Sequence, residues 1–176
     1  MPENLVLTKL SPLYRAAILE MIADYQSAGE RRYDAIRELI LTDFAAYLRK
    51  LEDNERGINL PPEFSPDSVY FLLKDGKTFL GSLRLRHKLV PGLMVEGGNI
   101  GYDIRPSQRR KGYATQMLRL GLEKAREIGL QRVLITCDET NIASARVIEK
   151  NGGILENRLP SPDRGVPISR YWIDLS

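Results

Sequence analysis

The chain has 176 residues, of which 43% are hydrophobic and 28% are charged, and its formal net charge is +3. This length suits one domain with a substantial hydrophobic core, and the composition excludes a disordered or fibrous chain. With one cysteine and one histidine, the sequence cannot form an internal disulfide and provides no Cys/His metal cluster, so we expect no bound metal.

The basic residues are partly clustered, at Arg105 and at residues 109–111, and such a local cluster suits a small polyanion better than a nucleic acid. Residues 1–4 do not begin a signal peptide, and no apolar run approaches the roughly 20 residues of a membrane span. We therefore expect a cytoplasmic protein with no nucleic-acid or membrane partner, organised as a single domain over residues 1–176.

The first half of the chain predicts a strand, two helices and a loop. Ser11 and Pro12 are typical of a helix start, and Gly29 is typical of a helix end. Apolar residues then recur at helical spacing in a second segment. The predicted elements are a strand at 5–10, a helix between Ser11 and Gly29, a helix at 36–51 and a loop at 53–67, which is long enough to be functional.

The second half predicts strands that alternate with helices, and its order gives a mixed α/β sheet with helices on its faces. The strands at 99–104 and 132–137 are expected to be parallel and joined by a right-handed crossover. The predicted elements are strands at 69–73 and 78–85 joined at Asp75-Gly76, a turn at Pro91-Gly92, a strand at 99–104, a helix at 115–128, a strand at 132–137, a short helix capped by Asn141, and strands at 154–157 and 168–175.

Residues 104–115 lie between a predicted strand and a predicted helix, and place Arg109 to Lys111 directly before Gly112. The first N–H groups of a helix lack partners, and the helix dipole favours an anion there. Gly112 would let the backbone approach a phosphate closely, and Ala114 keeps the helix entry uncrowded. The pattern predicts a diphosphate site, and its alternative is an ordinary basic helix start.

This segment resembles the acetyl-CoA pyrophosphate loop of the GNAT superfamily of N-acetyltransferases, whose pattern is Gln/Arg-x-x-Gly-x-Gly/Ala. The asparagine, helix and Glu-Lys-x-Gly ending at residues 141–152 resemble the family's next motif, so the resemblance covers residues 97–155. It implies a GNAT-like acyl-CoA N-acyltransferase fold, in which a central mixed, mostly antiparallel sheet is flanked by helices and contains a splayed pair of parallel strands.

The resemblance further implies acetyl-CoA as acetyl donor and a primary amine of a small molecule or peptide as acceptor, which attacks directly in a ternary complex. Family members are often dimers, which leaves a homodimer open. The backbone near Ile104 would bind the pantetheine arm and offer an N–H to the oxyanion. Asn141 would contact the same arm, or act only as a helix cap. The residues expected to hold the cofactor are Ile104, Arg105, Arg109, Arg110, Lys111, Gly112, Tyr113, Ala114, Thr115, Asn141 and Ser144.

Catalysis needs a base or a desolvated pocket, because a lysine-like amine is mostly protonated at neutral pH. Glu96 is the preferred base, and its alternative is a surface carboxylate. Tyr102 could line the acceptor site or supply a proton, and its alternative is core packing. Ile148 stands where the family often has a tyrosine that protonates the leaving thiolate. Cys137 ends a strand beside the expected thioester, and its alternative is a small core residue.

Two other functions remain open at this point. Ile148 is compatible with a non-catalytic acyl-CoA-binding or sensing module, which would bind CoA without turnover of any amine. The basic residues 105–111 are compatible with nucleic-acid binding, which would weaken steeply with salt.

Overall fold

Two antiparallel sheets form the framework of the fold. The computed structural model describes residues 3–161 and 163–176, and every hydrogen-bonded strand pair among them is antiparallel. The first sheet has the strand order β1-β2-β3-β4 and the second has the order β5-β7-β6. The strands are β1 (Leu5–Thr8), β2 (Asp67–Lys74), β3 (Thr78–Arg86), β4 (Ile100–Ile104), β5 (Arg132–Asp138), β6 (Ile154–Leu159) and β7 (Ile168–Asp174).

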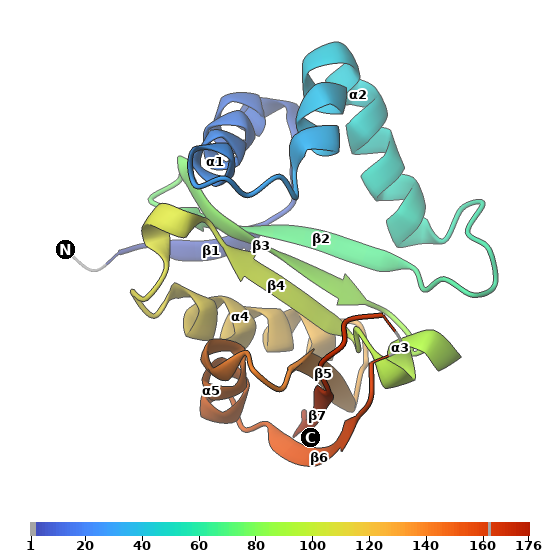
Figure 1. Cartoon of the computed structure of the whole chain (residues 1–176). Coiled ribbons are helices and arrows are strands. Elements are labelled where there is room, and N and C mark those ends of the chain that lie inside the picture. Colours follow the sequence, from blue (N-terminus) through green and yellow to red (C-terminus); the bar gives the residue numbers. More distant parts are fainter. Residues whose placement is uncertain (1–2, 162) are drawn as a thin grey trace.

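The helices cover both faces of the first sheet, as Figure 1 shows. On one face lie α1 (Arg15–Ser27) and α2 (Asp34–Arg56), and on the other lie α4 (Tyr113–Glu127) and α5 (Ile142–Lys150). None of the helices in the described part of the chain is long and apolar enough to cross a membrane. The remaining helical pieces are the short helix α3 (Pro91–Val95) and the 3-10 turns at Pro12–Tyr14 and Pro106–Gln108.

The expected α/β fold, mostly antiparallel and flanked by helices, is confirmed, and so is the hairpin between β2 and β3, but the strands form two antiparallel sheets in place of one mixed sheet. Asp75 and Gly76 both have positive φ, at 50° and 72°, which suits the tight turn of a two-stranded hairpin. The turn predicted at Pro91-Gly92 is wrong. A proline fits the first position of a helix as well as it fits a turn, and here it begins α3.

The long helix α2 has a kink in its middle, and its last turn includes residues that the sequence predicted as loop. Asp43 has non-helical angles (φ −150°, ψ 80°), and its Oδ1 accepts a hydrogen bond from the backbone N–H of Ala46 at 2.8 Å. This bond caps the start of the second half of the helix. The second half then continues to Arg56. Gly57, at φ 70°, ends it, so the loop predicted from residue 53 begins four residues later.

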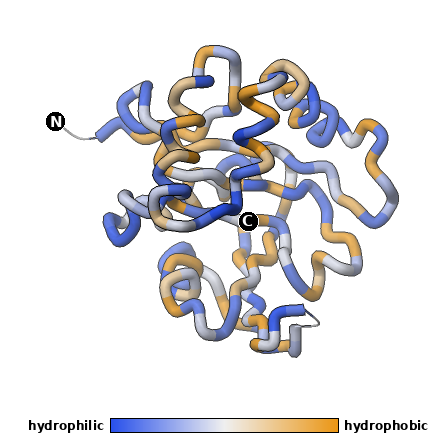
Figure 2. The backbone as a smooth tube through the Cα atoms, turned by 45° about the horizontal axis from the view of Figure 1, so that its top comes forward, coloured by the Kyte–Doolittle hydropathy of each residue, from blue (hydrophilic) through white to orange (hydrophobic). Residues whose placement is uncertain are grey.

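Two hydrophobic cores lie on opposite faces of the first sheet. The core under α1 and α2 contains Tyr25, Ile40, Phe71 and Phe79, and the core under α4 and α5 is larger and continues into β5 and β7. Figure 2 shows hydrophobic and hydrophilic residues alternating along the strands and helices, as this arrangement requires.

The strands β4 and β5 meet at one end only. Asn99, directly before β4, donates its backbone N–H to the carbonyl of Leu134 at 2.7 Å, and its Oδ1 accepts the N–H of Leu134 at 2.9 Å. Gly98 makes this approach possible, because a Cβ there would lie 2.3 Å from the Leu134 carbonyl oxygen. Beyond this point the two strands share no ladder of hydrogen bonds, so β4 has an unpaired edge.

Candidate active site

Two adjoining cavities open at the unpaired edge of β4. One has a volume of about 500 Å³ and is lined by the start of α4 and the start of α5; we call it the helix-start cavity. The other has a volume of about 440 Å³ and is lined mainly by β3, β4, the end of β5 and the two residues that follow α3; we call it the sheet cavity. Arg32, Tyr102 and Asp103 line both cavities and so mark their junction.

Unpartnered backbone N–H groups face the helix-start cavity. In the described part of the chain, the N–H groups of residues 110–115 have no hydrogen-bond acceptor. Arg110 and Gly112 have positive φ, at 63° and 84°, which turns successive N–H groups of the loop toward one side. Such a concave loop at a helix start is an anion-binding arrangement. Most of the sequence-predicted cofactor residues line this cavity, namely Ile104, Arg109, Arg110, Gly112, Tyr113, Ala114, Thr115, Asn141 and Ser144.

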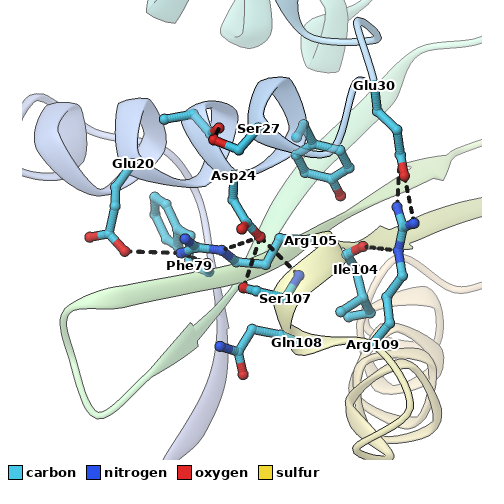
Figure 3. Close-up of polar contacts among 12 residues, drawn as sticks. Glu20, Asp24, Ser27, Glu30, Phe79, Ile104, Arg105, Ser107, Gln108 and Arg109 are labelled. Carbon is cyan, nitrogen blue, oxygen red and sulfur yellow. Dashed lines mark hydrogen bonds and ion pairs between the residues drawn. The ribbon is translucent and has the colours of Figure 1, made fainter.

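The cationic side chains of this segment are less free than the sequence suggests, as Figure 3 shows. Arg109 pairs through Nη1 and Nη2 with both carboxylate oxygens of Glu30, at 2.6 and 2.8 Å, and its Nε donates to the Ile104 carbonyl at 2.9 Å. Its guanidinium therefore joins the segment between α1 and α2 to the end of β4 beside the cavity.

The arginine at position 105 lies outside the cavity. Its Nε donates to Asp24 at 3.0 Å and its Nη1 to Glu20 at 3.1 Å, so the guanidinium points toward α1 (Figure 3). Lys111 donates to the side chain of Gln108 at 3.1 Å and does not line the cavity either. Of the residues expected to hold the cofactor, Arg105 and Lys111 are therefore the two that do not line the cavity. A charge run in sequence does not say where each side chain points.

Asn141 and Ser144 close the cavity from the start of α5. Asn141 Oδ1 accepts the backbone N–H of Ser144 at 3.1 Å, which is the helix cap expected from the sequence. The hydroxyl of Ser144 lies 3.0 Å from the hydroxyl of Tyr102 on β4. This contact joins the two walls of the cavity across the gap between β4 and α5.

Burial raises the pKa of Tyr102 to about 12, although the hydrogen bond with Ser144 acts in the opposite direction. Its hydroxyl therefore stays protonated at neutral pH. Because the folded pKa lies above the unfolded value of about 10, the stability linked to this proton is complete below pH 10 and is lost as the pH rises toward 12.

We accordingly expect the Tyr102→Phe variant to lose less of its free energy of unfolding between pH 9 and pH 11.5 than the unchanged protein, by about 1–2 kcal/mol. Urea unfolding at the two pH values measures this difference. An equal loss in both proteins would mean that the hydroxyl titrates as it does in the unfolded chain.

Asp103 is a junction residue that sequence reasoning missed. Its side chain is 8% exposed and lies 2.9 Å from Arg32. Its carboxylate accepts hydrogen bonds from the hydroxyls of Tyr25 at 2.7 Å, Tyr33 at 2.9 Å and Ser82 at 2.9 Å. A polar residue within the short strand β4 was the only available signal, because the donors come from α1, from the residue before α2 and from β3.

Glu96 and Arg164 form one wall of the sheet cavity. Glu96 pairs with Nε of Arg164, and its Oε2 accepts the hydroxyl of Ser161 at 3.0 Å. Arg164 also lies 3.1 Å from Asp138 at the end of β5. Glu96, the expected base, therefore faces the cavity. Its carboxylate forms an ion pair with Arg164, a residue for which the sequence predicted no role.

The other candidates have ordinary environments. Ile148 is fully buried in the core and lines neither cavity, and His87 Nε2 lies 2.8 Å from the buried Ser68 hydroxyl, away from both. Cys137 lines the sheet cavity, and burial raises the pKa of its thiol, so the thiol is neutral and a poor nucleophile.

Comparison with known proteins gives one family and several similar structures. Residues 4–154 match the model of the acetyltransferase (GNAT) domain. The fold is similar to that of RimJ from Mycobacterium smegmatis in complex with a CoA disulfide, at a TM-score of 0.71 and 18% identity, covering 97% of this chain and 81% of that one. It is also similar to the microcin C7 self-immunity acetyltransferase MccE in complex with acetyl-CoA and AMP, at a TM-score of 0.67 and 16% identity, covering 97% and 92%.

A third similar structure is a chimera of spermidine N-acetyltransferase from Vibrio cholerae and hSSAT, at a TM-score of 0.64 and 16% identity, covering 97% of this chain and 95% of that one. At these identities the likeness establishes the fold. The search of curated proteins found no match.

Proposed function

The chain belongs to the GNAT acetyltransferase family, and from this premise we propose that it transfers the acetyl group of acetyl-CoA to a primary amine that binds in the sheet cavity. The whole chain acts as one catalytic domain in this proposal. The observation that carries it is the junction of two cavities at Tyr102 and Asp103, because a ternary complex needs separate donor and acceptor sites that meet at one point.

The residues of the helix-start cavity fit the cofactor. The unpartnered N–H groups of residues 110–115 match the acceptor oxygens of a diphosphate, and Arg110, which is exposed at the cavity, adds a positive charge. The unpaired edge of β4, up to Ile104, offers backbone donors and acceptors to an amide-containing arm. Asn141 and Ser144 complete the opposite wall. Acetyl-CoA, when bound there, supplies an activated acetyl group.

Two sets of side chains would move the protons. The Glu96 carboxylate would accept the proton that the amine must lose, since it faces the acceptor cavity. The Tyr102 hydroxyl, which is held protonated and is hydrogen-bonded to Ser144, would donate a proton to the leaving sulfur. Tyr102, with Ser144, would thus protonate the leaving thiolate, which Ile148 cannot do. A catalytic function therefore does not require a tyrosine at position 148.

The first test is calorimetric titration with acetyl-CoA and CoA, followed by measurement of free-thiol release with a panel of amines. We expect binding in the micromolar range and thiol release that depends on the amine. The absence of acetyl-CoA binding in a folded sample would refute the proposal, and binding without release from any amine would refute its catalytic part.

The Glu96→Gln variant should lower kcat/KM by about 10²-fold, with the largest loss at acidic pH, because removing a proton from the amine limits the rate most there. The measurement is the pH–rate profile of thiol release. Arg164→Gln is the control, since it removes the ion-pair partner of Glu96 and keeps the carboxylate. Equal losses in both variants, with no change in the shape of the profile, would assign Glu96 to holding the cavity wall.

A further inference from the structure

Arginine side chains that the proposed reaction does not use line the floor of the sheet cavity. Side chains alternate along a strand, so Ser82, Arg84 and Arg86 share one face of β3. All three line the cavity, whereas Leu83 and Leu85 lie in the core on the other face. Arg84 and Arg86 therefore place two positive charges along this floor, on the side away from Ser82.

The remaining arginines of the cavity are neutralised by close carboxylates. Arg32 lies 2.9 Å from Asp103, and Arg164 pairs with both Glu96 and Asp138. The carboxylates offset the positive charge of Arg32 and Arg164, so neither arginine attracts an anionic ligand strongly.

Arg84 and Arg86 lack such partners. Arg84 is half exposed, and its nearest carboxylate is Asp67, at 3.9 Å, which is too long for a hydrogen bond. Arg86 makes two hydrogen bonds, from Nη1 to the carbonyls of Gly97 and Gly98 at 3.1 and 3.2 Å. Burial lowers the pKa of Arg86, as expected for a guanidinium that has lost water without gaining a close carboxylate.

The cavity is therefore polarised along β3. At its junction end, near Ser82, the carboxylate of Asp103 accepts hydrogen bonds. At its far end, no carboxylate of the described residues lies within hydrogen-bond distance of Arg84 or Arg86, because Asp67 is 3.9 Å from Arg84 and Glu96, next to the Gly97 that accepts from Arg86, pairs with Arg164. Four residues of strand, about 13 Å, separate Ser82 from Arg86. A guanidinium presents planar, paired donors that suit a carboxylate or a phosphate.

We propose that the acceptor is a primary amine that also carries an anionic group, a carboxylate or a phosphate, several bonds from its nitrogen. The anion binds at Arg84 and Arg86 while the amino group reaches the junction at Tyr102 and Asp103. The inference rests on the proposed function and names its substrate class. It also disfavours polycationic amines, because their distal charges would meet the arginines.

The test compares amines of one chain length that differ at the far end: 6-aminohexanoate, its amide and 6-aminohexyl phosphate, with spermidine as a polycation. Thiol release gives kcat/KM for each amine, and calorimetry gives the affinity of 6-aminohexanoate for the CoA-saturated protein. We expect kcat/KM to be at least about tenfold higher for the carboxylate or the phosphate than for the amide. The ratio of the two anionic amines tells which anion the site prefers.

The variant Arg84→Gln should raise KM for the anionic amines about tenfold and leave the amide unchanged. Arg56→Gln is the matched control, because Arg56 is also exposed, also lies 3.9 Å from a carboxylate and lines none of the cavities described above. Arg86→Gln should act in the same way as Arg84→Gln, and if it fails to fold, Arg84→Gln decides the question.

Two outcomes would overturn the inference and leave the proposed function standing: equal use of the amide and the carboxylate, or an equal loss with both in Arg84→Gln. If no amine releases thiol, the proposed function fails, and the calorimetric affinity for 6-aminohexanoate with its loss in Arg84→Gln still decides whether the anion site exists.

Discussion

Replacing Gly112 with leucine is expected to weaken acetyl-CoA binding by about 100-fold or more while the protein stays folded. Because Gly112 lines the helix-start cavity, a leucine side chain there is expected to occupy space that the phosphates need to reach the N–H groups of residues 110–115. Losing two charge-assisted hydrogen bonds of about 1.5–3 kcal/mol each is sufficient for this effect. Calorimetric titration of the variant with acetyl-CoA measures it.

The matched control is Gly129→Leu, at the other end of α4. Gly129 and Gly112 have the same φ of 84°, and a Cβ at either position has no atom within 4 Å. Both variants should therefore lose the same stability, about 1–2 kcal/mol, from the left-handed conformation. Only Gly112→Leu should lose affinity. If both variants bind acetyl-CoA equally, the phosphate site lies elsewhere.

Removing the hydroxyl of Tyr102 is expected to lower kcat by about 100-fold with little change in the affinity for acetyl-CoA. The reason is that a general acid acts mainly in the transition state, where it contributes about 10²–10⁴-fold. The Tyr102→Phe variant keeps the ring and so keeps the packing between the cavities. Single-turnover thiol release, with calorimetry of acetyl-CoA binding, separates the two effects.

Two further variants make this test specific. Ser144→Ala removes the hydroxyl 3.0 Å from Tyr102, and if the two hydroxyls act as a unit, the double variant should be about as slow as either single variant. Tyr47→Phe is the control, because burial also raises the pKa of Tyr47 to about 12 and its side chain also lines the sheet cavity. A loss of kcat in Tyr47→Phe equal to that in Tyr102→Phe would contradict the assignment.

Much of the fold could be predicted because it depends on local signals. Periodic apolar residues indicated the main helices, alternating and β-branched residues indicated the strands, and Asp75-Gly76 indicated the hairpin. The failures were local ambiguities. Pro91 is compatible with a turn or a helix start, and Asp43 could not be recognised as an internal cap because the apolar pattern continues across it.

The helix-start cavity was predictable in part for the same reason. Gly112 and Asn141 act through backbone geometry that is set within a few residues, so their positions follow from sequence order. The partners of Arg105 and Arg109 did not follow from it, because Asp24 and Glu30 lie about 80 positions earlier and approach only when α1 packs on the sheet.

The sequence by itself determined the element order, the loop proposed to bind the diphosphate and the family resemblance, because each resides in a contiguous run of residues whose backbone preferences are local. Only the tertiary structure placed the residues of the proposed acceptor cavity. The junction at Tyr102 and Asp103, the ion pairs of Arg32 and Arg164, and the contact between Tyr102 and Ser144 all join segments distant in sequence. Charge and hydrogen bonding depend on distance in space, which the order of residues does not contain.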